Sequence, residues 1–127
     1  MITIKNIEIH RYSSDYGESN NAFGQPLGVK SIVIITVISK CGLARSSELY
    51  SGIYIPDILP DLINLLSKHY INKSYDEPTI KFINAIPFIS NSGIFRSIQG
   101  AIESSILQIY FARKNINIVD GLKKLLK

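Results

Sequence analysis

Residues 31–50 read SIVIITVISKCGLARSSELY, and this stretch decides the fold. Residues 31–39 are rich in β-branched side chains, which favour a strand over a helix, and the run is too short to cross a membrane. Lys40-Cys41-Gly42 follows as a turn in which Gly42 can take a positive φ. Residues 43–50 return as a more polar strand, so the stretch predicts a β-hairpin. Its first strand is apolar on both faces, and each face therefore needs cover.

The composition bounds the class of protein. A chain of 127 residues is the size of one domain, and we expect a single domain over residues 1–127. A hydrophobic content of 46% and a mean hydropathy of +0.15 predict that some apolar surface belongs to an interface. No apolar run reaches the roughly 20 residues of a membrane-spanning helix, and the first residues lack a signal peptide. The single cysteine, Cys41, favours a cytoplasmic protein.

The net charge of +4 does not indicate a nucleic-acid-binding protein. Half of that excess lies at the C-terminal end, and the remaining charges are spread over the rest of the chain. No stripe of basic residues and no series of interleaved aromatic residues accompanies them. We therefore expect neither nucleic acid nor a membrane among the partners. The C-terminal charges are those of Asp120, Lys123, Lys124 and Lys127.

The segment before the hairpin divides into a strand and a long connection. Period-two alternation predicts a strand over Thr3–Arg11, with a β-bulge near Lys5-Asn6. The composition of Tyr12–Val29 is dominated by Ser, Asn, Gly and Pro, and we expect neither strand nor helix there. A connection of this length is either a simple linker or a lid whose aromatic side chains close over a ligand.

Three helices are predicted after the hairpin. The first begins at Asp57 as N-cap, with Pro60 in its first turn. A shorter second helix begins at Asp76, and a third runs from Ile94 to Lys114. The predicted buried face of the first helix is Ile58, Leu59, Leu62, Ile63, Leu65, Leu66 and Tyr70; that of the third is Ile94, Ile98, Ile102, Ile106 and Ile109.

The last turns of the third helix carry a second apolar side, formed by Leu107, Tyr110 and Phe111. A helix that is apolar on two sides needs two partners, so these three residues are the candidates for an interface. The expected fold is α+β, with a three-stranded antiparallel sheet followed by about three helices.

The residues alone reveal no catalytic site. No phosphate-binding glycine loop, no metal-ligand spacing and no nucleophile elbow is present. His10 is best explained as an ordinary strand-end residue, and His69 as favourable near the end of a helix. Glu48 is the only carboxylate of the return strand, and a carboxylate without a partner is usually structural.

Two motifs resemble the N-terminal capping domain of the enolase superfamily, in the mandelate racemase/muconate lactonizing enzyme branch. The segment Gly42-Leu43-Ala44-Arg45-Ser46-Ser47-Glu48 lies where that family often has a turn glycine, two further glycines and a glutamate. Gly42 and Glu48 match this motif, which makes them its structural residues. Arg45 and Ser47 replace the two later glycines.

The second motif lies in the last predicted long helix. Residues 101–114 resemble the final capping helix of the family, often written A-x-x-x-A-L-W-D-L and followed by a basic stretch. Gln108 stands where that pattern has aspartate, and Asn115 and Asn117 replace a glycine and a proline. Residues 122–126 resemble the leucine pair that precedes the barrel.

The resemblance implies a lid-bearing domain rather than a catalytic one. In such enzymes a (β/α)₈ barrel holds Mg²⁺ and the acid–base residues, and the capping domain contributes two loops over its mouth. By position these loops correspond to 12–29 and 49–55, with Tyr16, Phe23 and Tyr54 as candidates for contact with substrate. The resemblance thus favours a lid over a simple linker, and it implies no metal or cofactor in this chain.

The printed sequence stops where the barrel would start, so we expect no catalysis by this chain alone. It is then a fragment, the product of a broken or split gene, or one subunit of a two-chain isomerase, racemase, cycloisomerase or dehydratase. The alternative is a free-standing binding or oligomerisation module without enzymatic role. The expected partner is accordingly a barrel domain or chain, or a second copy. Neither substrate nor oligomeric state follows from the sequence.

Overall fold

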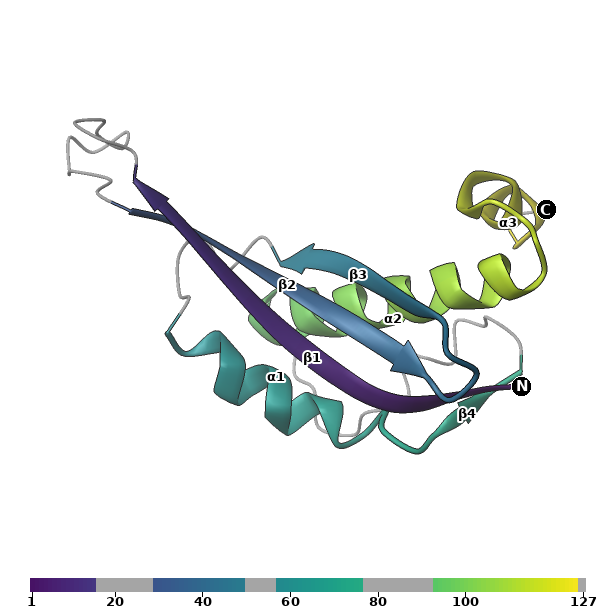
Figure 1. The fold of residues 1–127 in the computed structure, drawn as a ribbon, viewed down its shortest axis with the longest axis horizontal. Coiled ribbons are helices and arrows are strands. Elements are labelled where there is room, and N and C mark those ends of the chain that lie inside the picture. The colour runs from purple at the N-terminus through teal and green to yellow at the C-terminus, as the bar shows by residue number, and fades with distance from the viewer. Residues whose placement is uncertain (16–28, 50–56, 77–92, 126–127) are drawn as a thin grey trace.

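The computed structural model describes residues 1–15, 29–49, 57–76 and 93–125 (Figure 1). These residues form an α+β fold with an antiparallel sheet of order β3-β2-β1-β4. The elements, in chain order, are β1 (Ile2–Asp15), β2 (Val29–Ser39), β3 (Ala44–Leu49), α1 (Leu59–Ser67), β4 (Ser74–Tyr75), α2 (Gly93–Arg113) and α3 (Ile118–Leu125).

The predicted hairpin is confirmed. Strands β2 and β3 pair in an unbroken register from Val33 opposite Leu49 to Ile38 opposite Ala44. The turn closes where the Ser39 amide donates to the Leu43 carbonyl at 2.9 Å. Gly42 has a φ of +93°, the conformation that the turn required of a glycine.

Strand β1 is longer than the sequence indicated. The predicted bulge is confirmed, since the register with β2 shifts between Ile4 and Asn6. The prediction that no strand extends beyond Arg11 is wrong, because pairing continues to Asp15 opposite Val29. The ladder of backbone hydrogen bonds to β2 holds these residues extended despite their turn-forming composition.

The sheet has a fourth strand, so the prediction of three strands is corrected. Ile2 and Thr3 pair with Tyr75 and Ser74 of β4, and the hydroxyls of Thr3 and Ser74 lie 2.7 Å apart. A strand of two residues is too short to show any periodicity in sequence. It exists because the turn after α1 returns the chain beside β1.

Helix α1 begins later than predicted. Ile58 is its N-cap and makes no side-chain capping bond, so the assignment of Asp57 as cap is wrong, whereas Pro60 does lie in the first turn. The Asp57 carboxylate instead accepts a hydrogen bond from Arg11 at 2.7 Å. Leu59, Ile63, Leu66 and Tyr70 are buried as expected; Ile58 and Leu65 are exposed, which corrects that part of the predicted face.

Helix α2 supplies the largest part of the core. Its residues Ile98, Ile102, Ile106 and Ile109 are buried as predicted, whereas Ile94 at the start is exposed. These side chains pack with the inward residues of β2, and Ser105 and Ser47 join helix to strand through hydroxyls 2.8 Å apart. The inward residues of β2 are Val33, Ile35 and Val37.

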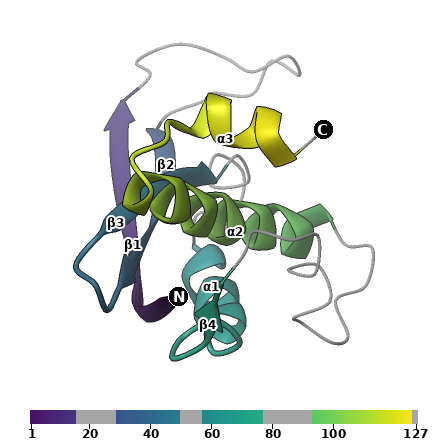
Figure 2. The same cartoon turned by 90° about the vertical axis from the view of Figure 1, so that its right-hand side faces the viewer.

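The helices lie together on one side of the sheet, as the second view shows (Figure 2). Among the described residues, no helix covers the opposite face, where Ile32, Ile34 and Ile38 remain partly exposed. The expectation that both faces of β2 need cover is therefore met by the described residues on one face only.

Helix α3 folds back on the end of α2. Phe111 is 4% exposed, and a Cβ on Gly121 would lie 2.5 Å from its ring. Only a glycine allows this approach. The expectation that Phe111 needs cover from another molecule is wrong, because α3 of the same chain covers it.

The remaining prediction, a helix beginning at Asp76, falls outside the described residues from position 77 onward. Asp76 itself is exposed, and its carboxylate lies 3.5 Å from the N-terminal ammonium of Met1.

Candidate functional site

One end of the sheet gathers the attachment points of residues 16–28 and 50–56, which hold most of the lids predicted over 12–29 and 49–55. Asp15 and Val29, which flank residues 16–28, pair with each other there. Leu49, which precedes residues 50–56, pairs with Val33 four residues along β2. Asp57, which follows that segment, is bonded to Arg11 of β1. The two segments therefore leave and re-enter the fold at the same end of the sheet.

Beyond Leu49, strands β1 and β2 continue as a two-stranded ribbon (Figure 1). The ribbon runs past the end of β3, so Asp15 and Val29 lie away from the body of the domain (Figure 1). The three lid candidates, Tyr16, Phe23 and Tyr54, lie outside the described residues.

The two motif residues lie apart from each other. Gly42 is in the turn at the opposite end of the sheet from the lid attachments. Glu48 is exposed on the sheet face that no described helix covers, opposite Ile34 of β2. His10 follows on the same face, with its Nε2 3.4 Å from the Glu8 carboxylate. The structure thus does not bring Gly42, Glu48 and the lid attachments into one site.

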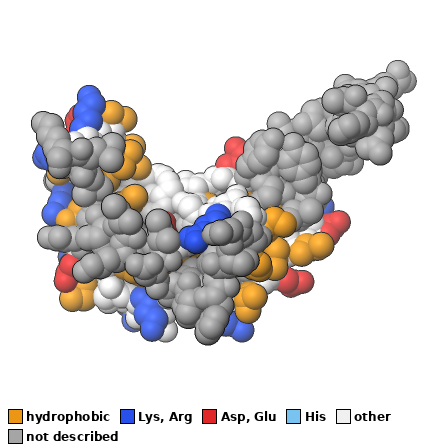
Figure 3. Space-filling view, turned by 180° about the vertical axis from the view of Figure 1, so that it is seen from behind, with side chains coloured by type: hydrophobic (Ala, Val, Ile, Leu, Met, Phe, Trp, Pro, Cys, Tyr) orange, Lys and Arg blue, Asp and Glu red, His pale blue; other side chains and the backbone are white. Residues whose placement is uncertain are grey.

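The interface candidates are divided by the fold. Phe111 is buried, while Leu107 and Tyr110 are partly buried against the core. The more exposed apolar residues of this region are Val119 and Leu122 on α3, which adjoin Lys123 and Lys124. Seen from behind, orange and blue side chains gather together at the α3 end, next to a hollow in the surface (Figure 3).

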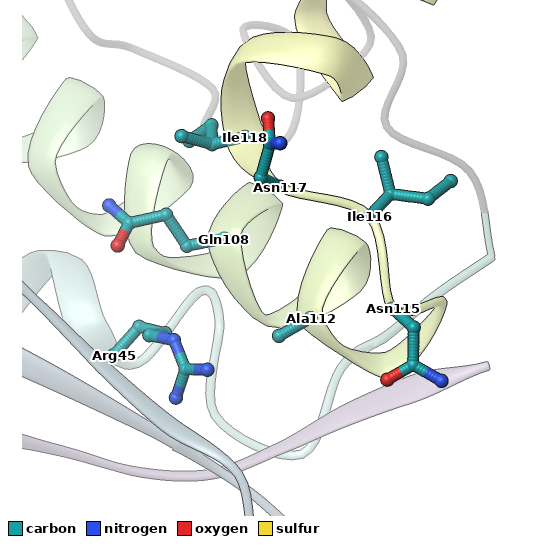
Figure 4. Close-up of a pocket in the computed structure, with 7 residues that line it drawn as sticks. All are labelled: Arg45, Gln108, Ala112, Asn115, Ile116, Asn117 and Ile118. Atoms are coloured by element: carbon teal, nitrogen blue, oxygen red, sulfur yellow. The ribbon is translucent and has the colours of Figure 1, made fainter.

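A groove of about 400 Å³ lies between β3, the end of α2 and the link to α3. In Figure 4, Arg45 extends from β3 toward the side of α2 that carries Gln108 and Ala112, and the link curves around the far end. The groove is open to solvent on one side, and its volume suits a side chain or small ligand. Its lining residues are Arg45, Gln108, Ala112, Asn115, Ile116, Asn117 and Ile118.

Local structure holds the groove in shape. Asn115 has a φ of +56°, which lets the chain reverse after α2, and the Ile116 amide donates to the Phe111 carbonyl at 2.9 Å. Asn117 caps α3, because its Oδ1 accepts from the Asp120 amide at 2.9 Å. In the sequence these residues were notable only as differences from a motif that the chain resembles.

A second polar cluster lies inside the domain, and sequence reasoning missed it. Glu103 of α2 accepts hydrogen bonds from the Tyr70 hydroxyl at 3.0 Å and from the Gln99 amide at 3.1 Å. Tyr70 and Gln99 are buried, and the ring of Tyr75 lies 6.5 Å from that of Tyr70. Gln99 and Glu103 follow one another at helical spacing, but nothing in the sequence placed Tyr70 against them.

Burial and mutual contact change the pKa values of the residues in this cluster. Burial raises the pKa of the Glu103 carboxyl, although the Gln99 and Tyr70 hydrogen bonds oppose the shift. Burial, followed by the nearby Glu103 charge, raises the pKa of Tyr70, and the same two causes raise the pKa of Tyr75 to about 12. Because Glu103 already accepts from two protein groups, we interpret the cluster as a structural network rather than an acid–base site.

Cys41 is exposed in the hairpin turn. A hydrogen bond with Ser39 is the largest of the effects that lower the pKa of its thiol. In the part of the chain that the structure describes, no three His, Cys, Asp or Glu side chains form a group that could hold a metal ion. Among the described helices, none is long and apolar enough to cross a membrane.

Neither the scan against protein-family models nor the search of curated proteins finds a match for this chain.

Proposed function

We propose that this chain is a capping domain that closes over the active site of a (β/α)₈-barrel partner of the muconate cycloisomerase type. The observation that carries the proposal is that the described residues on either side of 16–28 and of 50–56 lie at one end of the sheet. A lid needs its mobile parts to start from a common, rigid base, and the long β1–β2 ladder supplies one. The motif resemblance in residues 42–48 and 101–114 supports the same function.

In this proposal the chain shapes the site but performs no proton transfer. Tyr16, Phe23 and Tyr54 contact substrate, and lid closure excludes water from the reaction. The Mg²⁺ ion that supplies the charge stabilisation of such reactions belongs to the partner. The barrel is carried either by a separate chain or by a continuation of this one.

The exposed residues of α3 favour a docking role at the end of the domain. Val119 is 58% exposed and Leu122 is 39% exposed, and both lie on an amphipathic helix. Burying them against a partner would remove apolar surface from water. This observation also favours the second candidate function, a free-standing module that associates with its own copies through the same residues.

The test is reconstitution. The chain is mixed with a separately expressed barrel of this enzyme class from the same genome, and the exchange of carboxylate α-protons for deuterium is followed by NMR in the presence of Mg²⁺. We expect exchange only when both chains are present. Variants Tyr16→Ala and Tyr54→Ala should alter the substrate preference, whereas Lys68→Ala, an exposed change after α1, should not. If the barrel neither binds nor becomes active, and sedimentation shows the chain alone to be a dimer, the free-standing module is the better explanation.

A further inference from the structure

The polar residues of the groove share a feature that the sequence alone did not relate. Arg45 and Gln108 belong to β3 and α2, and Asn115 and Asn117 to the link after α2. These residues lie far apart in the chain, and the fold gathers them on one surface (Figure 4).

Arg45 gives the groove its charge. It is the one charged side chain among the lining residues that the structure describes. A positively charged groove favours a partner group of the opposite charge.

The Arg45 guanidinium has N–H donors that no described residue accepts. It is partly buried, and its Nη1 donates to the carbonyl of the adjacent Ala44 at 2.7 Å. No carboxylate of the described residues forms a salt bridge with it. The nearest acid along the link, Asp120, is bound instead by the Asn117 amide at 2.8 Å. A guanidinium carries five N–H donors in a planar fork that matches a carboxylate.

We propose that the groove receives an acidic side chain of the barrel partner, which pairs with Arg45. The inference rests on the proposed function and adds the chemistry of the contact. Gln108 lies in the same lining, and its side-chain amide, which donates one N–H to the Ser104 hydroxyl at 3.4 Å, has a second N–H for the other carboxylate oxygen. Ala112, Ile116 and Ile118 provide the apolar wall against which the methylene groups of a glutamate pack.

The groove is tested first without the barrel. The chain, labelled with ¹⁵N, is titrated with the blocked dipeptide acetyl-Glu-Glu-amide and, in parallel, with acetyl-Gln-Gln-amide. We expect shifts of the Arg45 side-chain N–H and of the Gln108 and Asn115 amides with the glutamate peptide only. Arg45→Gln should abolish them, and Arg11→Gln, at an arginine already paired with Asp57, should retain them. Equal shifts with both peptides, or shifts that persist in Arg45→Gln, overturn the inference.

The second measurement is the affinity of the chain for the barrel by calorimetry. Arg45→Gln should weaken binding about tenfold, equivalent to about 1.4 kcal/mol, and reduce its salt dependence. Arg45→Lys should recover only part of the loss, because an ammonium cannot form the bidentate pair. If the barrel binds both forms equally, the inference is wrong and the proposed function stands. If the barrel does not bind the wild-type chain at all, both the proposed function and this occupant of the groove are wrong.

Discussion

Polar side chains near the two ends of helix α2 have different surroundings. In the first half, Gln99 and Glu103 turn inward and bond to each other and to Tyr70, so the cluster is complete within the chain. In the second half, Gln108 lines an open groove beside Arg45 and Asn115. The helix is continuous from Gly93 to Arg113, so the difference comes from what packs against each half.

The comparison separates polar groups that hold the fold from polar groups that are available to a partner. A buried acceptor that loses its donor costs stability, because nothing replaces the hydrogen bond. A donor at an open groove is hydrated, and its loss leaves the fold nearly unchanged. Changes to the Glu103 cluster should therefore affect unfolding, and changes to the groove residues should affect binding.

The largest effect is expected where α3 closes the end of α2. Gly121→Ala places a methyl group 2.5 Å from the buried Phe111 ring, and we expect the free energy of unfolding to fall by about 2 kcal/mol. Urea denaturation followed by circular dichroism measures it. Gly100→Ala is the matched control, because nothing lies within 4 Å of its added Cβ and the helix should gain about 0.5–1 kcal/mol. Equal effects of the two substitutions would contradict the packing of α3 on Phe111.

The internal cluster of Tyr70, Gln99 and Glu103 should show the next largest change in the free energy of unfolding. Tyr70→Phe keeps the buried ring but removes the hydroxyl that donates to Glu103, so we expect a loss of about 1.5 kcal/mol in the same assay. Tyr110→Phe is the control, since its hydroxyl accepts only from Lys114 at an exposed position and should change stability by less than about 0.5 kcal/mol. If both variants unfold like the wild type, the cluster does not stabilise the fold.

The pH dependence should reveal the Glu103 carboxyl. Because its pKa is raised in the folded chain, the wild type loses stability as the pH rises from the ordinary carboxyl range through that raised pKa. Glu103→Gln keeps an acceptor for Tyr70 and removes the titration. The variant should match the wild type near pH 4 and melt about 2 °C higher at pH 8, a small effect because solvent screens the partly exposed carboxyl. A wild type that gains stability relative to the variant as the pH rises would reverse the assigned direction.

The smallest effect on stability is expected at Arg45, and it best separates polar groups that bind a partner from those that hold the fold. Arg45→Gln should change the free energy of unfolding by less than about 0.5 kcal/mol, because its described hydrogen bond is to the adjacent Ala44 carbonyl. Thermal denaturation beside the binding titrations would show whether binding is lost without loss of the fold. A large destabilisation would mean that Arg45 belongs with Glu103 among the structural polar groups.

Much of the sheet was predictable from local pattern, and much of the candidate site was not. The β-branched run of residues 31–39 and the glycine turn specified the hairpin, and alternation located β1 and its bulge. The two residues of β4 carry no periodic signal. The local pattern predicts a helix cap at Asp57, because a contact with Arg11, 46 positions away, leaves no trace in the neighbouring residues. The groove escaped prediction for the same reason, since its lining joins position 45 to position 118.

The sequence by itself determined the hairpin, the start of β1 and the long helix α2, because backbone preference and hydrophobic period are properties of neighbouring residues. Tertiary structure alone decided that Phe111 is covered from within by α3, that Glu103 meets Tyr70, and that four scattered polar residues line one groove. Those outcomes depend on distances between residues far apart in the chain, which are set only when the helices pack on the sheet.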